Sequence, residues 1–467
     1  MISPVTFTDR ARKDLGTPGV AALEIGARRL VAKRQRAEAD FPAMEAMRDQ
    51  ARAIRLHALN HLDGLLGQFA DSVEANGGNV HFAADGDEAI DYIQKLAASR
   101  GVRRIVKSKS MVTEEIHLNA ALETSDLEVV ETDLGEFIIQ LAGETPSHII
   151  APVMHKTRYD VGELFAEKLG IDYTDDPLEL NGIARHHLRE IFLSADMGIS
   201  GCNVAIAESG SLVLVTNEGN GRLTTSAPRI HVAVMGMERI VPTLADASVI
   251  LEVLARSATG QRLSVYTNVV SGPRRQGDPD GPDELHVIVL DNGRSRVLGG
   301  DTAEILACIR CGACLNVCPV YREAGGHAYG NTYSGPIGAV VTPALMGLEK
   351  WHDLPYASSL CGACLDACPV RIDLPGLLLK LRRQAVGEGH PPDGLEKALN
   401  WYTRLATNPR LWRGATRVGG IGAQLLAKEG WLGSLPGRGA GWTDHRDLPA
   451  PAAKPFHTRW KDRQRGT

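Results

Sequence analysis

Seven of the eight cysteines of this 467-residue chain lie between residues 308 and 368, in two groups of similar spacing. They are, in order, Cys308, Cys311, Cys314 and Cys318, followed by Cys361, Cys364 and Cys368. The first group is a C-x2-C-x2-C-x3-C-P run, and the second repeats its last three cysteines and the proline. In such runs three closely spaced thiolates bind one iron–sulfur cubane, while the fourth reaches the other cluster. The pattern therefore predicts two clusters that pass single electrons.

Crossed ligation divides the seven thiolates between two clusters. One 4Fe-4S cluster is expected on Cys308, Cys311, Cys314 and Cys368, and the other cluster on Cys318, Cys361 and Cys364. The second group has Ser358 where the first has its leading cysteine. Three interpretations of the second cluster stay open: a 3Fe-4S cluster, a 4Fe-4S cluster with a labile corner, or one completed by Ser358, another oxygen or nitrogen ligand, or a partner.

Structural zinc and disulfides are the alternative uses of these cysteines. Zinc needs four ligands per site in two knuckles, which the triplet and the repeated Cys-Pro ending do not supply. Disulfides are not expected in a chain without an export signal, because the cytosol keeps thiols reduced. Cys202, the eighth cysteine, begins an apolar run and is expected to be a small buried residue. No dinucleotide fingerprint follows a strand, so the sequence identifies neither an electron donor nor an acceptor.

The segments before the cysteines predict an α/β fold. Apolar residues recur at helical spacing over residues 20–36 and 47–76, which predicts N-terminal helices that pack on the next domain. From residue 79 onward, short apolar runs, for example at 79–84, 147–152 and 285–290, alternate with amphipathic stretches. This alternation predicts a mostly parallel or mixed sheet with helices on both faces.

Composition divides the chain into four predicted parts. We expect an N-terminal helical segment over 1–70, an α/β domain over 71–298, an α-helical two-cluster ferredoxin-like domain over 299–380 and an irregular C-terminal tail over 381–467. With 43% apolar and 23% charged residues, the chain resembles an ordinary soluble protein. No apolar run reaches the ~18 residues of a spanning helix, and the charged N-terminus does not read as a signal peptide. We therefore expect a cytoplasmic protein.

The tail differs from the rest of the chain in charge. From Arg382 onward it holds 15 Lys and Arg against 7 Asp and Glu, a net charge of +8, in a chain whose total is −5. It also holds five of the six tryptophans. A basic tail of this kind suggests docking on a partner or on an anionic membrane face. A solvated tail that folds back over its own body is the alternative, and no motif supports nucleic-acid binding.

Polar residues at strand ends are candidates for a small-molecule site in the α/β domain. Glu208, Asn217 and Arg222 surround one predicted strand pair, and open α/β sheets bind ligands at strand ends. A turn around Asn217, or support of the fold, is the alternative. Residues 107–110 follow a strand and precede a helix, where amides and lysines can receive an anion. A solvated helix cap is the plainer explanation of that stretch.

Several segments together resemble a known family. KSKSMVTEEI, AESGSLVLVTNEGN, CIRCGACLNVCPVYR and SLCGACLDACPV, in this order and spacing, resemble the lactate utilization protein B family, iron–sulfur proteins of bacterial L-lactate oxidation. The resemblance covers about residues 20–380, and the absence of a cysteine at Ser358 agrees with it. It implies an α/β domain similar to the sugar-isomerase and CoA-transferase type. It also implies an electron carrier in a complex with two companion proteins.

One main functional hypothesis and two alternatives follow. The protein is expected to relay single electrons from L-lactate, as it becomes pyruvate, toward an acceptor, as a subunit of an oxidoreductase complex. In the first alternative the α/β domain is the catalyst and binds lactate or a thioester through Glu208, Asn217 and Arg222, with the clusters secondary. In the second, the chain is a cluster-bearing sensor or scaffold, which predicts no reduction of the iron during turnover.

Overall fold

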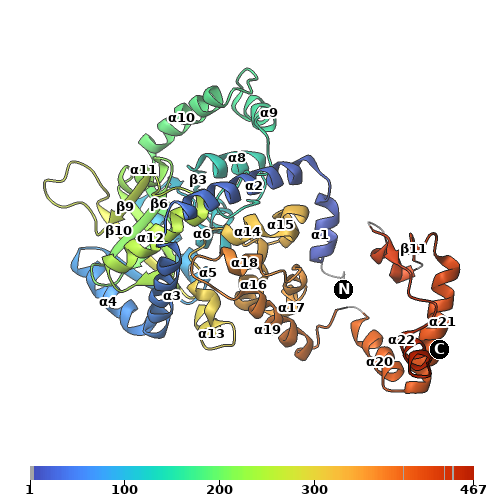
Figure 1. The fold of residues 1–467 in the computed structure, drawn as a ribbon. Helices are drawn as coiled ribbons and strands as arrows, with labels where there is room; N and C mark the ends of the chain where they lie inside the picture. Colours follow the sequence, from blue (N-terminus) through green and yellow to red (C-terminus); the bar gives the residue numbers. More distant parts are fainter. Residues whose placement is uncertain (1–4, 393, 436, 444–445, 467) are drawn as a thin grey trace. The chain divides into compact units, whose positions relative to one another are not determined.

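The computed structural model describes residues 5–392, 394–435, 437–443 and 446–466. The chain divides into two compact units, one up to His390 and one from Pro391 onward. The first three predicted parts therefore pack together in the first unit (Figure 1). Among the described residues, no helix is both long and apolar enough to cross a membrane.

Four N-terminal helices open the first unit, and the last three of them lie over the two stretches whose apolar spacing predicts helices. They are α1 (Phe7–Asp14), α2 (Pro18–Ala39), α3 (Met44–Asn60) and α4 (Leu62–Ala75). The start of α2 is set by Thr17, whose side chain accepts the N–H of Val20, and by Pro18 at the first helical position. Helix α2 packs against the sheet domain through α12 (Leu244–Thr259) and against the cysteine region through α14 (Ala313–Val317). The N-terminal helices therefore join the two regions.

A six-stranded sheet, parallel throughout, forms the centre of the first unit. Its order is β1 (Asn79–Ala83), β10 (Glu284–Leu290), β7 (Ile230–Gly236), β4 (Met197–Ser200), β2 (Arg104–Lys107) and β3 (Glu128–Glu131). Alternate residues of β7 separate onto two faces: Val232 and Val234 pack with the helices that follow β1 and β2, whereas Ala233 and Met235 pack with α4. The sheet is covered on both faces, as parallel sheets require, which confirms the predicted α/β fold.

The helices of this domain connect the strands along the chain. They are α5 (Gly86–Arg100), α6 (Met111–Glu115), α7 (Leu118–Glu123), α8 (Leu134–Ala142), α9 (Arg158–Leu169), α10 (Pro177–Ser194), α11 (Asn220–Ser226), α12 and α13 (Arg294–Leu298). A second, mixed sheet has the order β8 (Ile240–Val241), β5 (Val204–Ile206), β6 (Ser211–Thr216) and β9 (Tyr266–Val270). It contains the predicted strand pair around Glu208.

Residues 147–152, predicted to be a strand, form a loop instead. The ring of His148 supplies the hydrogen-bond acceptor that a neighbouring strand would otherwise provide. Its Nδ1 accepts the N–H groups of Ile150 and Ala151 at 3.0 and 3.1 Å. Its Nε2 therefore carries the proton and donates to Asn316 Oδ1 at 3.0 Å, and burial lowers the pKa of His148 to about 4. The strand prediction was wrong because this apolar run packs on α14 and not in a sheet.

The cysteine region is helical, as predicted. It comprises the 3-10 turns η2 (Ala303–Ala307), η3 (His327–Tyr329) and η4 (Leu354–Tyr356) and the helices α14, α15 (Pro319–Ala324), α16 (Gly335–Met346), α17 (Leu348–Trp351), α18 (Ala363–Ala367) and α19 (Leu374–Gly387). Helix α14 packs against α18, and α16 packs against α19. One hydrophobic cluster joins these helices to α2, α3 and α12, so the cysteine region shares its core with the rest of the unit.

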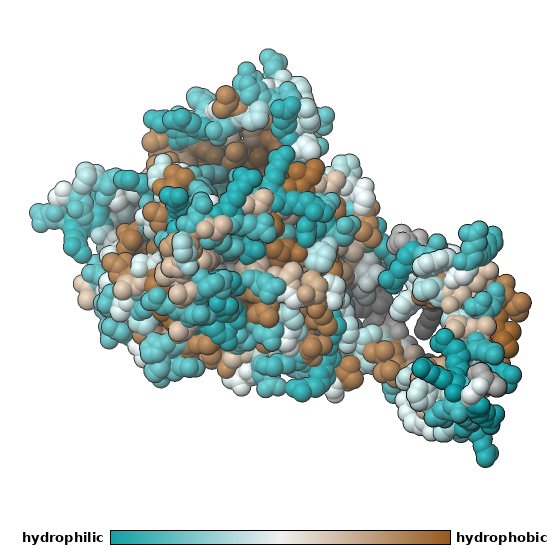
Figure 2. Space-filling model, in the orientation of Figure 1, coloured by the Kyte–Doolittle hydropathy of each residue, from teal (hydrophilic) through white to brown (hydrophobic). Residues whose placement is uncertain are grey.

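The second unit holds α20 (Leu395–Ala406), α21 (Pro409–Leu426), η5 (Gly437–Trp442), α22 (Phe456–Gln464) and the short strand pair β11 (Trp431–Leu432) and β12 (Leu448–Pro449). With 18 residues, α21 is a longer regular element than the predicted irregular tail would contain. Among described side chains, α20 buries none and α21 buries only Gly420. Figure 2 accordingly shows hydrophobic side chains on the surface of this unit, where Val418 and Leu425 are exposed.

Candidate functional site

The two cysteine groups adopt the same local backbone. Arg310 and Leu360 have φ values of 58° and 55°, and Gly312 and Gly362 have φ values of 73° and 85°. Each group then enters a short helix, α14 or α18, that ends at the last cysteine of the group. A positive φ is uncommon in a residue with a side chain and costs free energy. The internal repeat is therefore also a repeat of conformation.

Ser358 occupies the position of the missing cysteine in this repeat. In the first group the N–H of Arg310 donates to Cys308 Sγ at 3.3 Å. In the second group the N–H of Leu360 donates to Ser358 Oγ at 3.1 Å. Both bonds run from residue i+2 to the side chain of residue i. The hydroxyl of Ser358 thus lies where the first group presents a thiol.

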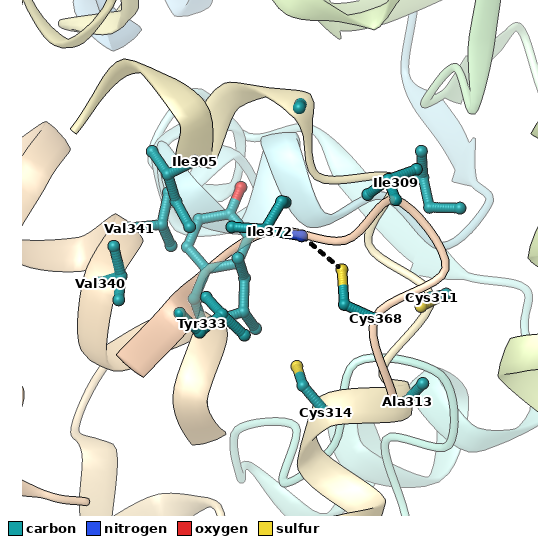
Figure 3. Packing of buried hydrophobic residues seen from close by; sticks show 14 of the residues in the cluster. Ile305, Ile309, Cys311, Ala313, Cys314, Tyr333, Val340, Val341, Cys368 and Ile372 are labelled. Carbon is teal, nitrogen blue, oxygen red and sulfur yellow. Dashed lines mark hydrogen bonds between the residues drawn. The ribbon is translucent and has the colours of Figure 1, made fainter. Parts of the chain in front are cut away.

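One cavity gathers the four cysteines expected for the first cluster. Its lining includes Cys308, Cys311, Cys314 and Cys368 together with apolar residues such as Ile337 and Ile372. The N–H of Ile372 donates to Cys368 Sγ at 3.3 Å, and Figure 3 shows Cys311, Cys314 and Cys368 in this packed cluster. Thiol donors, apolar walls and N–H groups directed at sulfur are what an iron–sulfur cluster needs. The residues present therefore fit the group.

The other three cysteines lie together at the junction of α14 and α18. Burial, and after it the thiols of Cys318 and Cys361, raise the pKa of Cys364 to about 12. Cys318 Sγ accepts the N–H of Tyr321 at 3.5 Å. Cys361 is exposed, whereas Cys318 and Cys364 are buried. This second set is thus more open to solvent at one corner than the first.

Buried thiols must lose their protons before they can bind iron. Burial raises the pKa of Cys368 to about 11, and it also raises the pKa values of Cys311 and Cys314. At neutral pH these side chains are protonated when no metal is bound. Loading of the site is therefore coupled to proton release, as for other thiolate sites. Among the described residues, no three His, Cys, Asp or Glu side chains converge as a ready site for a single metal ion.

A buried ion network lies between the sheet and the first cysteine. Arg294 donates to Glu115 Oε1 and Oε2 at 2.9 and 2.8 Å and to Glu238 Oε2 at 2.7 Å. The hydroxyl of Tyr333 also donates to Glu115, at 2.6 Å. Burial would raise the pKa of Glu238, but Arg294 and then Arg239 hold it at about 2. The network therefore keeps full charges inside the protein.

Comparison with known proteins identifies the family. Three family models match: the LUD domain over residues 66–290, the 4Fe-4S dicluster domain over 304–372 and the C-terminal region of lactate utilisation protein B over 382–465. Lactate utilization protein B of Shouchella clausii is 47% identical over 466 residues, which cover 99% of this chain and 98% of that protein. This chain belongs to the lactate utilization protein B family.

Other members are similar over comparable lengths. The protein of Geobacillus thermodenitrificans is 48% identical over 424 residues, covering 90% of this chain and 89% of that protein. The protein of Bacillus velezensis is 45% identical and covers 99% of this chain and 98% of that protein. Among solved structures, a DUF162 family protein of Deinococcus radiodurans matches 49% of this chain and 98% of that chain, with 18% identity and a TM-score of 0.28. Similarity to the sugar-isomerase and CoA-transferase type stays a prediction.

The three α/β candidates are not gathered in one place in this family member. Asn217 lines a large cavity beside the first sheet, where its amide donates to Gln261 at 2.9 Å. The carboxylate of Glu208 accepts the N–H of Leu244 at 2.7 Å, at the start of α12. Arg222 is exposed on α11. Of the three, only Asn217 is among the residues that line the described cavities.

Residues that sequence reasoning passed over lie closer to the cysteines. Arg239 Nη1 donates to the carbonyl of Cys308 at 3.4 Å, and Arg310 stacks over the ring of Tyr333 at 4.3 Å. Both arginines line the same large cavity as Asn217. The sequence could have pointed to Arg310, because it lies between two of the cysteines. No motif surrounds Arg239, so the sequence offered no reason to select it. Cys202 is half-buried on the wall of this cavity, less enclosed than expected.

Proposed function

We propose that this protein relays single electrons in lactate utilization, from L-lactate as it becomes pyruvate toward an acceptor. The observation that carries the proposal is the convergence of cysteines from both groups around one apolar cavity, in a chain with a 4Fe-4S dicluster domain. Relatives that match over nearly the whole chain bear the name lactate utilization protein B. No comparable set of observations favours a catalytic α/β domain.

In this proposal the seven cysteines hold two clusters. One 4Fe-4S cluster is held by Cys308, Cys311, Cys314 and Cys368, and the second cluster by Cys318, Cys361 and Cys364. Bound clusters of this kind take up and release one electron at a time. The position of Ser358, whose Oγ matches Cys308 Sγ in local bonding, makes it the residue of this chain best placed to complete or flank the second cluster.

The residues around the first cluster site are expected to control how easily the site is reduced. Ile337 and Ile372 give the first cavity apolar, buried walls. Backbone N–H groups of Arg310 and Ile372 donate to sulfur, and the cationic side chain of Arg310 is buried beside Cys308. Hydrogen bonds and positive charge both favour added negative charge. These residues are therefore expected to make reduction of the site easier.

Companion lactate-utilization proteins supply the donor and the acceptor in this proposal. The second unit is the proposed docking element, for a partner or an anionic membrane face, because α20 and α21 present Leu399, Trp401 and Leu425 to solvent. Basic residues prevail in the same segment. Nucleic acid is not among the proposed partners.

The relay is tested by electron paramagnetic resonance on protein purified without oxygen. About seven or eight irons per chain, with matching sulfide, are expected. Addition of L-lactate together with the companion proteins is expected to produce signals of reduced clusters. Lactate alone, without those proteins, is the control. Zinc in place of iron contradicts the cluster assignment, and iron that stays oxidised during lactate oxidation favours a sensor or scaffold.

Replacing Ser358 with cysteine tests the vacant position in the second group. The thiol of Ser358→Cys is expected to supply a fourth sulfur, since Ser358 Oγ already accepts the same backbone bond as Cys308 Sγ. The variant is then expected to retain four irons in the second cluster under mild oxidation that gives a three-iron signal in the wild type.

The neighbouring Ser359 provides the matched control for that experiment. Its side chain is exposed and bonds to Cys361, but the N–H of Leu360 is bonded to Ser358, so residue 359 does not match the position of Cys308. Ser359→Cys places a thiol near the second cluster but outside that position, and it is expected to give the same three-iron signal as the wild type under mild oxidation. Equal loss of iron from Ser358→Cys and Ser359→Cys counts against a ligand position at residue 358.

A further inference from the structure

A large cavity lies where strands of the parallel sheet end. It measures about 470 Å³ and is lined by residues that follow β2, β3 and β4 and by the end of β6. Open α/β sheets bind ligands outside the carboxyl ends of their strands. Cavities of ~300 to 1,000 Å³ are the size that small organic ligands occupy. Place and size are therefore those of a ligand site.

Two buried guanidinium groups on the wall of this cavity carry nitrogens that have no hydrogen-bond acceptor among the described residues. Arg310 is 6% exposed, and its Nε and Nη1 have no partner among the described residues. Arg239 is 7% exposed, and its Nε is likewise unpaired in the described part of the chain. Glu238 approaches them only to 3.9 and 3.7 Å and is also bonded to Arg294. Buried N–H donors normally have acceptors, so this wall is incomplete without an anion.

We propose that this cavity binds an organic anion whose carboxylate or phosphate lies against Arg310 and Arg239. The rest of the ligand lies along apolar residues of the same lining, such as Ile149, Leu214 and Leu254. A three-carbon acid would leave much of the cavity empty, so the geometry points to a larger organic anion. This site goes beyond the electron relay, which does not require the cavity.

The other charges of the cavity are compatible with an anion. Lys109, which also lines it, is paired with Glu136 at 3.1 Å. The carboxylates in the lining are Asp133 and Glu218. Burial, and then the neighbouring Asp133, raise the pKa of Glu218 to about 7. Glu218 is therefore partly protonated at neutral pH, so it repels an anion in the cavity less than a fully charged carboxylate would.

The proposed site adjoins the first cluster site through one residue. Arg310 lines both the large cavity and the cavity formed by Cys308, Cys311, Cys314 and Cys368. It lies between two of those cysteines in the chain. An anion bound to Arg310 is consequently next to the segment that holds the first cluster. The charge of a ligand bound there therefore lies close enough to interact with the charge of the segment that holds the first cluster.

Calorimetric titration of the cluster-loaded full chain, without oxygen, tests the site. The probes are inorganic phosphate, pyruvate, L-lactate and flavin mononucleotide. At least one organic probe is expected to bind more tightly than inorganic phosphate, and Arg310→Gln is expected to weaken it by about 10- to 100-fold, because charge-assisted hydrogen bonds are lost. Arg185→Gln, which removes an exposed arginine of α10 outside the cavity, is expected to leave binding unchanged.

A second variant keeps the test valid if Arg310→Gln also disturbs the cluster. Ala258→Phe fills the cavity from α12 and is expected to abolish binding while the iron content and the resonance signals stay those of the wild type. Tighter binding of flavin mononucleotide than of pyruvate or L-lactate supports a larger organic anion, whereas equally tight binding of a three-carbon acid contradicts the inferred size of the ligand. Unchanged affinity in both variants, or no binding of any probe, overturns the proposal.

Discussion

Replacing Cys311 with serine is expected to remove about half of the iron and to abolish lactate-dependent growth. Cys311 is buried and lines the cavity with Cys308, Cys314 and Cys368. A serine hydroxyl is a poor substitute for a thiolate, and the buried position of Cys311 gives a replacement ligand from solvent less access than the second set has at its exposed Cys361. The second set of cysteines is unchanged, so its iron is expected to remain. Iron and sulfide analysis of the purified variant, with growth on L-lactate as sole carbon source, measures the effect.

Cys202 supplies the matched control for this substitution. It is the one cysteine outside the two groups, and its Sγ lies 3.9 Å from the carbonyl of Val213 in the α/β domain. Cys202→Ser is expected to keep the full iron content and normal growth. Full iron in Cys311→Ser, or unimpaired growth of that variant in a strain without a functional substitute, contradicts the ligand assignment and the electron relay.

The sequence predicted that the two cysteine groups share a local structure, because that information is local and repeated. Three cysteines separated by two residues, a glycine and a terminal proline fix the course of the chain over one turn and a short helix. The predicted crossed ligation requires that the two groups meet, because each would supply a thiolate to the other cluster. The packing of α14 against α18 provides that meeting. The alternation of short strands with helices predicted the parallel sheet for a similar reason.

Long-range pairing explains what the sequence did not reveal. An apolar run such as residues 147–152 has the same pattern whether it lies in a sheet or against another segment, and only the bond between His148 and Asn316 distinguishes the two. Glu208 and Arg222 stand near Asn217 in the chain, but the fold directs them elsewhere. Arg239, by contrast, reaches the cysteines because β7 ends beside them.

The second large effect is expected at Glu238, and it is an effect on stability. Glu238 and Glu115 are the two carboxylates of a buried network in which Arg294 bonds to both. Removing one charged partner of a buried pair costs about 3 to 5 kcal/mol, because the remaining charge is left unpaired. Glu238→Gln is therefore expected to lower the free energy of unfolding by about that amount near pH 7. Urea unfolding of the oxygen-free protein measures it.

The stabilising contribution of Glu238 is also expected to change with pH in a defined direction. The pKa of Glu238 is about 2 in the folded protein against 4.5 as the ordinary value, so its contribution is present above about pH 4.5 and is lost as the pH falls toward 2. The difference in the free energy of unfolding between wild type and Glu238→Gln is thus expected to narrow by about 1 kcal/mol from about pH 6 to about pH 4.

Glu128→Gln, which breaks a solvent-exposed pair with Arg104, is the control and is expected to cost less than about 1 kcal/mol. If Glu238→Gln and Glu128→Gln lower the free energy of unfolding equally, the buried network contributes no more than a surface ion pair. If the difference in stability between wild type and Glu238→Gln grows as the pH falls, Glu238 is not the charged carboxylate assigned here.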